Sequence, residues 1–255
     1  MYYYIFEQPK SKQERAAFEK IREVARDFGI YGEITQASPA RSAEELVMIA
    51  LNKKYSTIVA IGDDAHVNAI ISKIIKSDQK YNLALGIIAT NASSILYDRW
   101  GFKTAEEACE TLKYRKLTRF SLGFVEPDHY FLSSVKIVPP KPSRISLEVD
   151  HWKADAVIDK AEISNNLYIL LERNIKEKSF FKNSYDWLLG RDTTGSDQSI
   201  FKGKVIKISS NEPIPVYIGT KAIKQTPIEI YRKLNALNII TKRDKVSVDK
   251  ASSKV

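Results

Sequence analysis

The chain of 255 residues is long enough for one large domain or two smaller ones, and its 44% hydrophobic and 28% charged residues are typical of a globular protein. No apolar run approaches the roughly 18 residues that a membrane-spanning helix needs, and the first residues lack the basic region and cleavage site of a signal peptide. The single cysteine, Cys109, excludes an internal disulfide, so the sequence favours the reducing cytoplasm.

The formal charge of +9 leaves three interpretations: a nucleic-acid ligand, an anionic membrane surface, or no specific partner. The lysines are spread along the chain without an arginine-rich helix, so nucleic acid is not expected. Attraction to an anionic membrane surface stays open. One stretch mixes aromatic and basic residues in a way that suits a lipid interface, although ordinary packing of a hairpin explains it too. That stretch contains Phe180, Phe181, Tyr185 and Trp187 among Lys176, Lys178 and Lys182.

The first part of the chain, up to about Thr118, alternates apolar strands with amphipathic helices. Helical spacing of apolar residues, capping residues such as Ser42 and Thr104, and a stop at Gly29 mark the helix boundaries. This alternation predicts a Rossmann-like α/β domain with a parallel sheet and helices on both faces. The expected strands are Tyr2–Glu7, Ile30–Thr35, Thr57–Ile61 and Leu83–Ala89, and an expected helix is Val67–Lys76.

From Arg119 onward the helical period is lost. Short runs with alternating apolar residues follow, separated by turns and by a proline-rich crossing at residues 139–142. This pattern predicts an antiparallel β-sandwich-like domain. The sequence therefore divides into an α/β nucleotide-binding-type domain at residues 1–118, an antiparallel β domain at 119–240, and a disordered basic tail at 241–255.

The stretch from Thr57 to Ile71 carries the clearest functional signal. An apolar strand ends abruptly at Gly62, Asp63 and Asp64, and an apolar pattern at helical spacing restarts at Val67. In α/β proteins such a strand-to-helix turn lies at the carboxyl edge of the sheet, where ligands bind. The free N–H groups and partial positive charge of a helix N-terminus suit phosphate there.

Residues 62–69 resemble the G-G-D-G-T-x-N-E loop of the diacylglycerol kinase and sphingosine kinase family, whose superfamily includes the NAD kinases. In that family the loop holds ATP phosphates, and its aspartate serves the metal or the phosphoryl transfer. Gly62, Asp64 and Asn68 match the loop, whereas Asp63, Ala65, His66 and Ala69 depart from it.

Further segments resemble motifs of the same family, in the same order. Gly86–Phe102 resembles G-I-I-P-L-G-T-x-N-D-F-A-R-x-L-G-I, and Val216–Ile230 resembles V-x-V-D-G-E-P-x-x-x-T-P-V-E-I. Arg119–Val125 resembles the I-D-L-G-x-V segment where the family's chain enters its second domain, and Gln8–Lys12 is a weaker match to N-P-x-S-G. Positions that tend to be acidic in the family are here Ile95, Ser121, Gly219 and Lys221.

The resemblance covers Tyr2 to about Ile240 and implies an ATP- and Mg²⁺-dependent kinase. Its implied substrate is a lipid hydroxyl such as that of diacylglycerol, met by a cytoplasmic protein at the inner face of the membrane. Asp64 is implied as the catalytic or metal-binding residue. The implied nucleotide-binding residues are Gly62, Asp63, Ala65, His66, Asn68, Asn91 and Ser93.

The substitutions support a second hypothesis, a pseudoenzyme that keeps the scaffold as a binding or regulatory module. The charge of Asp63 would repel a phosphate by about 3 kcal/mol at about 5 Å and an effective dielectric constant near 20. Helix capping alone explains Asp63 and Asp64. His66 is expected at the surface, and Asn68 is expected to tether a neighbouring loop through its side chain. Both hypotheses stay open from the sequence.

Overall fold

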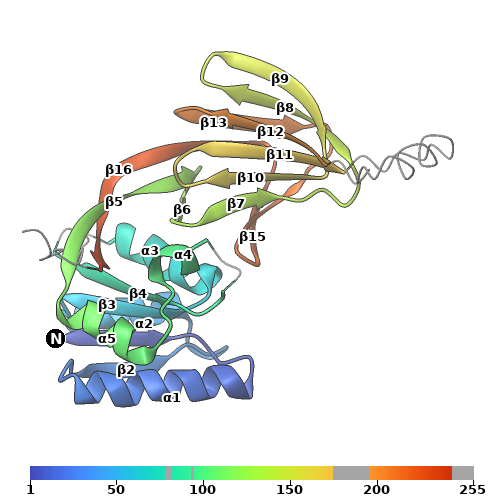
Figure 1. The fold of residues 1–255 in the computed structure, drawn as a ribbon. Helices are drawn as coiled ribbons and strands as arrows, with labels where there is room; N and C mark the ends of the chain where they lie inside the picture. The colour runs from blue at the N-terminus through green and yellow to red at the C-terminus, as the bar shows by residue number, and fades with distance from the viewer. Residues whose placement is uncertain (78–81, 93–94, 175–195, 243–255) are drawn as a thin grey trace, which may run out of the picture. The chain divides into compact units, whose positions relative to one another are not determined.

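The computed structural model describes residues 1–77, 82–92, 95–174 and 196–242. The chain forms two compact units. Among the described residues, the first, here called the α/β unit, contains those of Met1–Phe120 and residues 237–242, and the second, the β unit, contains those of Ser121–Ala236. Figure 1 shows both as ribbons. Ser93, the aromatic-basic stretch around Phe180 and the tail beyond Lys242 lie outside the described residues.

The α/β unit is built on a parallel sheet with the strand order β2-β1-β3-β4. The strands are β1 (Tyr2–Phe6), β2 (Gly32–Gln36), β3 (Thr57–Gly62) and β4 (Ala84–Ala89). The end of β16 (Ile228–Thr241) adds a further parallel strand beside β4. Every residue of β3 and β4 is buried, as expected for central strands covered on both faces.

Helices cover the two faces of this sheet (Figure 1). Because side chains alternate along a strand, Tyr4 and Phe6 of β1 face α1 and α5, in a core that includes the buried Cys109. Helices α2 and α3 pack against each other and against β1 and β3. The helices are α1 (Lys12–Asp27), α2 (Ala43–Asn52), α3 (Asp64–Ile75), α4 (Tyr97–Trp100) and α5 (Ala105–Lys113).

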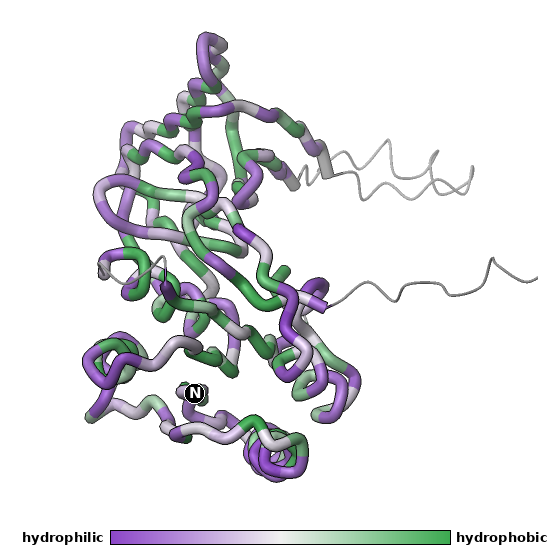
Figure 2. Tube along the Cα trace, turned by 90° about the vertical axis from the view of Figure 1, so that its left-hand side faces the viewer, coloured by the Kyte–Doolittle hydropathy of each residue, from purple (hydrophilic) through white to green (hydrophobic). Residues whose placement is uncertain are grey.

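The β unit contains antiparallel strands in two groups. One has the order β16-β13-β8-β9, with β5 beside β16 and β6 beside β5, and the other has the order β12-β11-β10-β7-β14-β15. Inward-facing apolar residues of both groups form one core, including Ile145, Ile206, Val135 and Ile169. Figure 2 shows the alternation as hydrophobic and hydrophilic segments along these strands. This arrangement, after the parallel sheet, confirms the predicted fold class.

The strands of the β unit are the second half of β5 (Lys116–Val125), β6 (His129–Phe131), β7 (Ser134–Ile137), β8 (Ser143–Val149), β9 (Trp152–Ile158), β10 (Lys160–Ser164), β11 (Tyr168–Asn174), β12 (Ser196–Lys202), β13 (Val205–Ser210), β14 (Pro215–Ile218), β15 (Lys221–Gln225) and most of β16.

Several predicted elements are present with shifted ends. The helix expected at Val67–Lys76 begins at Asp64, because Asp63 caps it. In the motif segment Val216–Ile230, β14 and β15 form a hairpin with Gly219 at φ +59° in the turn. The strand that follows, β16, extends beyond this segment to Thr241. Within the described part of the chain, no helix has the length and apolarity needed to cross a bilayer.

Candidate functional site

The candidate phosphate loop lies where the neighbouring strands β1 and β3 end together. Phe6 pairs with Ile61, and the N–H of Glu7 donates to the carbonyl of Ile61 at 2.8 Å. Directly afterwards β3 turns into α3, with Asp63 in extended conformation at φ −80°. None of residues 62–66 has a positive φ. The turn therefore lacks the left-handed backbone that a glycine-rich phosphate loop uses.

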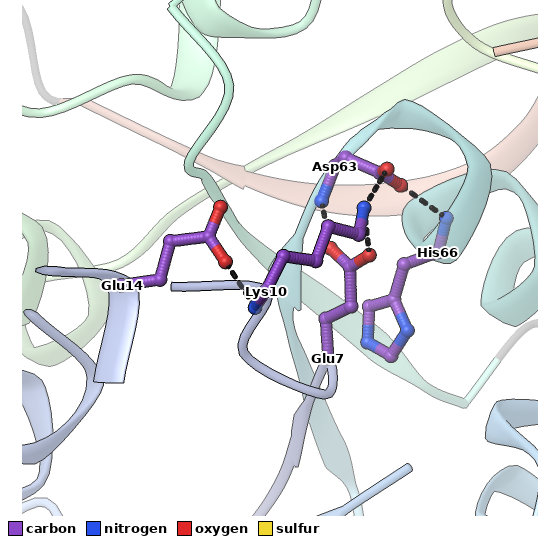
Figure 3. Close-up of polar contacts among 5 residues, drawn as sticks. All are labelled: Glu7, Lys10, Glu14, Asp63 and His66. Atoms are coloured by element: carbon purple, nitrogen blue, oxygen red, sulfur yellow. Dashed lines mark hydrogen bonds and ion pairs between the residues drawn. The ribbon is translucent and has the colours of Figure 1, made fainter. Parts of the chain in front are cut away.

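Carboxylates already occupy N–H groups of this turn (Figure 3). The Asp63 Oδ1 atom accepts from the backbone N–H of His66 at 3.0 Å, which caps α3. The N–H of Asp63 itself donates to Oε2 of Glu7 at 2.7 Å. The two donors that a bound phosphate would seek are thus satisfied by side chains of the protein.

Gly62 is required by this packing. A Cβ atom on Gly62 would lie 2.8 Å from both Cβ and Oε2 of Glu7, and 2.9 Å from Cδ2 of His66. Any side chain at position 62 would therefore push Glu7 or His66 out of place. The glycine that matches the kinase motif is explained here by the approach of a neighbouring strand.

The ammonium group of Lys10 joins the two carboxylates. Its Nζ atom lies 2.6 Å from Oε1 of Glu7 and 2.8 Å from Oδ2 of Asp63. Burial alone would raise the pKa of Asp63, but the hydrogen bonds from Lys10 and from the His66 N–H outweigh it and lower that pKa. Burial alone would lower the pKa of Lys10, but the hydrogen bonds and charges of both carboxylates raise it. Asp63 and Lys10 therefore stay charged near neutral pH.

His66 is buried, with 8% of its surface exposed, so the expectation of a surface residue is wrong. Its Nε2 atom lies 3.1 Å from the carbonyl oxygen of Ile5, where the Nε2–H tautomer donates a hydrogen bond. Burial lowers the pKa of the imidazole, so the ring is neutral at pH 7. A neutral ring turned toward β1 offers a phosphate no positive charge.

The other candidates of this turn lie in the first turns of α3. Asp64 and Ala65 are its first two residues, both half-buried. The side chain of Asn68 donates to the carbonyl of Asp64 at 2.6 Å, a contact within its own helix. Asn91 is exposed after β4, and the Thr90 N–H donates to the carbonyl of Gly62 at 3.1 Å, so the two strand ends meet.

The motif positions in the β unit have structural partners. Ser121, which stands for a family aspartate, accepts a hydrogen bond from the N–H of Asn235 at 3.2 Å. Lys221 is exposed at the start of β15, directly after the turn at Gly219. Neither Ser121 nor Lys221 supplies a carboxylate.

Sequence reasoning missed Glu7 and Lys10. Glu7 directly follows an apolar strand, as Gly62 does, and parallel neighbours end at the same edge of a sheet. The pairing of β1 with β3 is the signal that would bring Glu7 to the turn, but the order of the strands in the sheet must be known before it can be used. Lys10 lies in the weak motif match at Gln8–Lys12, where no adjacent residue marks it as the partner of a carboxylate.

The residues present fit neither the phosphates nor a metal-binding group in this arrangement. The cradle N–H groups bind Glu7 and Asp63, whose charge opposes a phosphate. Across the described ranges, no three His, Cys, Asp or Glu side chains gather as they would around a metal ion. Asp64 alone remains as a carboxylate at the motif position.

Residues 3–125 match the family model described as diacylglycerol kinase catalytic domain. This segment is diacylglycerol kinase-like. The match begins in β1 and ends with β5, so it includes both strand-to-helix turns of the kinase-like segment. The predicted resemblance is thereby confirmed for residues 3–125.

Solved structures of similar fold agree with this result. A diacylglycerol kinase from Bacillus anthracis str. Sterne has a TM-score of 0.68 at 15% sequence identity, covering 94% of this chain and 96% of that one. A candidate diacylglycerol kinase from the same strain has a TM-score of 0.70 at 14% identity, covering 94% and 96%. At such identities the likeness establishes the fold across both units. No curated protein matches the chain by sequence.

Proposed function

We propose that this lipid kinase-like protein does not transfer phosphoryl groups and acts as a binding or regulatory module. The observation that carries the proposal is the Glu7 carboxylate, 2.7 Å from the N–H of Asp63 in the phosphate turn. In effect, a built-in anion takes the place where the family resemblance puts a phosphate of ATP. The implied cofactors, ATP and Mg²⁺, are therefore not expected to bind.

Displacing these carboxylates would be costly. An incoming phosphate would have to separate Glu7 and Asp63 from Lys10 and from two backbone donors, while meeting their negative charges. At about 5 Å and an effective dielectric constant near 20, each such like-charge pair costs about 3 kcal/mol. Lys10 could compensate one of the two charges, but not both.

The rival function is ATP-dependent phosphorylation of a lipid hydroxyl, with Asp64 serving the metal or the reaction. The family match favours it, because that match covers the whole nucleotide-binding-type segment. A lipid or an anionic membrane surface would be the partner under either hypothesis. Each predicts a different response to nucleotide.

The test is thermal unfolding against ATP concentration, with and without Mg²⁺, at fixed ionic strength. Fixed ionic strength matters because a protein of charge +9 attracts any polyanion weakly. Specific binding at 100 times the dissociation constant would stabilise the protein by about 2.7 kcal/mol. We expect no shift at millimolar ATP. A Mg²⁺-dependent shift for ATP and none for pyrophosphate would overturn the proposal in favour of an active kinase.

A second arm removes the built-in anions. The double variant Glu7→Ala/Asp63→Gly frees the turn N–H groups and Lys10, so we expect it to gain a shift with pyrophosphate. The matched control is Glu33→Ala, which frees Lys53 from an ion pair of 2.7 Å elsewhere in the same unit. If the control gains the same shift, the effect is general charge, and Glu7 does not occupy a phosphate site.

A further inference from the structure

The β unit has a polar cavity that the kinase resemblance does not explain. The cavity of about 490 Å³ lies on the outer face of β8, β13 and β16, above the buried Ile208 and Ile228. Its walls carry both signs of charge, with Glu148, Lys207 and Glu229 on three adjacent strands. A site of this composition suits a ligand that carries both charges itself.

These charges alternate along a row across the sheet. Lys153 lies 3.3 Å from Glu148, and Lys207 lies 3.3 Å from Glu229. The pairs are open to solvent, since the side chains of Lys153 and Lys207 are 73% and 50% exposed. Solvent-exposed ion pairs contribute little to stability, so a charged ligand can replace one partner of such a pair at a small cost in free energy.

An aromatic cluster lies beside the Glu229 end of this row and includes Tyr231, which is on the same strand as Glu229. The ring of Phe124 is 4.7 Å from that of Tyr130 and 5.0 Å from that of Tyr231, centroid to centroid. Tyr231 is two residues beyond Glu229, so both point to the same face, roughly 6–7 Å apart. The carboxylate and the rings together form the surroundings that a quaternary ammonium group prefers.

The cluster already holds an ammonium group of the protein. The Lys233 Nζ atom lies 5.1 Å from the centroid of Phe124 and 4.7 Å from that of Tyr231. Both distances are within the reach of a cation–π interaction. Lys233 thus marks where a cation lies against these rings, and the ammonium group of a ligand would have to displace it.

We propose that this groove and the aromatic cluster beside Glu229 bind a phosphocholine-type group, with its ammonium at Tyr231 and Glu229 and its phosphate at Lys207 on the neighbouring strand. The two-carbon link between the charges of such a group is comparable to the spacing of neighbouring strands, about 4.8 Å. The site is independent of the phosphate turn, so it stands whether or not ATP binds.

The test is calorimetric titration of the full chain with phosphocholine, choline and inorganic phosphate, at fixed ionic strength. We expect phosphocholine to bind more tightly than either half. Lys207→Gln and Glu229→Gln should each weaken it about tenfold, the loss of one charge-assisted contact. Lys233→Ala should strengthen it, because the competing ammonium is removed. The matched controls are Arg144→Gln and Asp155→Asn, whose exposed side chains pair on the same sheet outside the cavity.

The proposal is overturned if phosphocholine binds no better than phosphate, or if the control substitutions weaken its binding as much as the groove variants.

Where phosphocholine does bind, vesicles of phosphatidylcholine identify the source of the phosphocholine group. Binding to vesicles that phosphocholine competes away indicates a lipid headgroup at a membrane surface. Binding of phosphocholine without vesicle binding indicates a small soluble ligand, and both results support the site.

Discussion

Helices α2 and α3 of the same unit begin in different ways. In α2 the cap is local: the Ser42 hydroxyl accepts from the N–H of Glu45, and the Glu45 carboxylate accepts from the N–H of Ser42 at 2.8 Å. In α3 the position that Glu45 holds in α2 is His66, and the returning carboxylate comes from Glu7, the residue directly after β1. The second capping box is completed from 56 residues away.

The difference teaches how a binding turn can be closed. A local box satisfies a helix end that has no other task. A carboxylate brought in from β1 satisfies the end of α3 at the sheet edge where ligands of α/β proteins bind, and so competes with any anion there. The following changes test this comparison.

The largest effect is expected at Glu7. Glu7→Ala leaves the N–H of Asp63 without its acceptor inside a half-buried turn, which should lower the free energy of unfolding by about 2 kcal/mol. Glu45→Ala removes the equivalent group of the local box and should cost less than about 1 kcal/mol, since that box is exposed. Urea denaturation of both variants measures the difference. Equal losses would show that the distant carboxylate is no more important than the local one.

The next effect is expected at the cap itself. Asp63→Ala should cost about 1 kcal/mol or somewhat more, because it removes both the helix cap and a partner of Lys10. Asp63→Asn keeps the capping oxygen and should retain most of that stability. Ser42→Ala is the matched control at α2. Chemical denaturation that finds Asn as harmful as Ala would mean that the charge, and not the cap, holds the turn.

His66 should make the stability depend on pH. Burial lowers its pKa in the folded state, so below its usual pKa of about 6.5 the unfolded chain binds more protons. The free energy of unfolding should therefore fall from pH 7.5 to 5.5, by at most about 1.4 kcal/mol per pH unit. His66→Asn should remove this slope, whereas His151→Asn at an exposed turn should leave it. A slope that persists in His66→Asn would assign it to another group.

The smallest effect is expected at Lys10. Its side chain is 60% exposed, so Lys10→Gln should cost about 1 kcal/mol or less at low salt, and less at high salt. Lys53→Gln is the control, because Lys53 makes a similar exposed pair with Glu33. Denaturation of the double variant Lys10→Gln/Asp63→Asn gives the coupling between the two residues. No coupling would contradict their direct interaction.

Local patterns made most of the fold predictable. The capping box at Ser42, the helix cap at Thr104, the stop at Gly29 and the alternating apolar residues of β8 and β13 act over a few residues, and the structure contains each of them. The fold class followed from their order along the chain. Strand ends were less certain, as the extension of β16 to Thr241 shows, because pairing partners decide where a strand stops.

The site was predictable only in part. The sequence indicated the turn at Gly62–His66 and a helix cap at Asp63 or Asp64, since both depend on adjacent residues, and in the structure Asp63 is the cap. It could not assign Glu7 to the turn or bury His66, because both depend on β1 lying beside β3. The repulsion between Asp63 and a phosphate that the sequence predicts also leaves out Lys10, whose ammonium group partly neutralises the Asp63 carboxylate.

The path of β16 has a consequence during synthesis of the chain. Asn238 and Ile239 pair with Ala84 and Leu85 at the edge of β4, after the whole β unit has been made. At roughly 5–20 residues per second, that edge waits on the order of ten seconds for its neighbour. An unpaired edge of the apolar strand β4 invites association with other chains during this interval. A nascent chain stalled before Leu237 should therefore aggregate more readily than the completed protein.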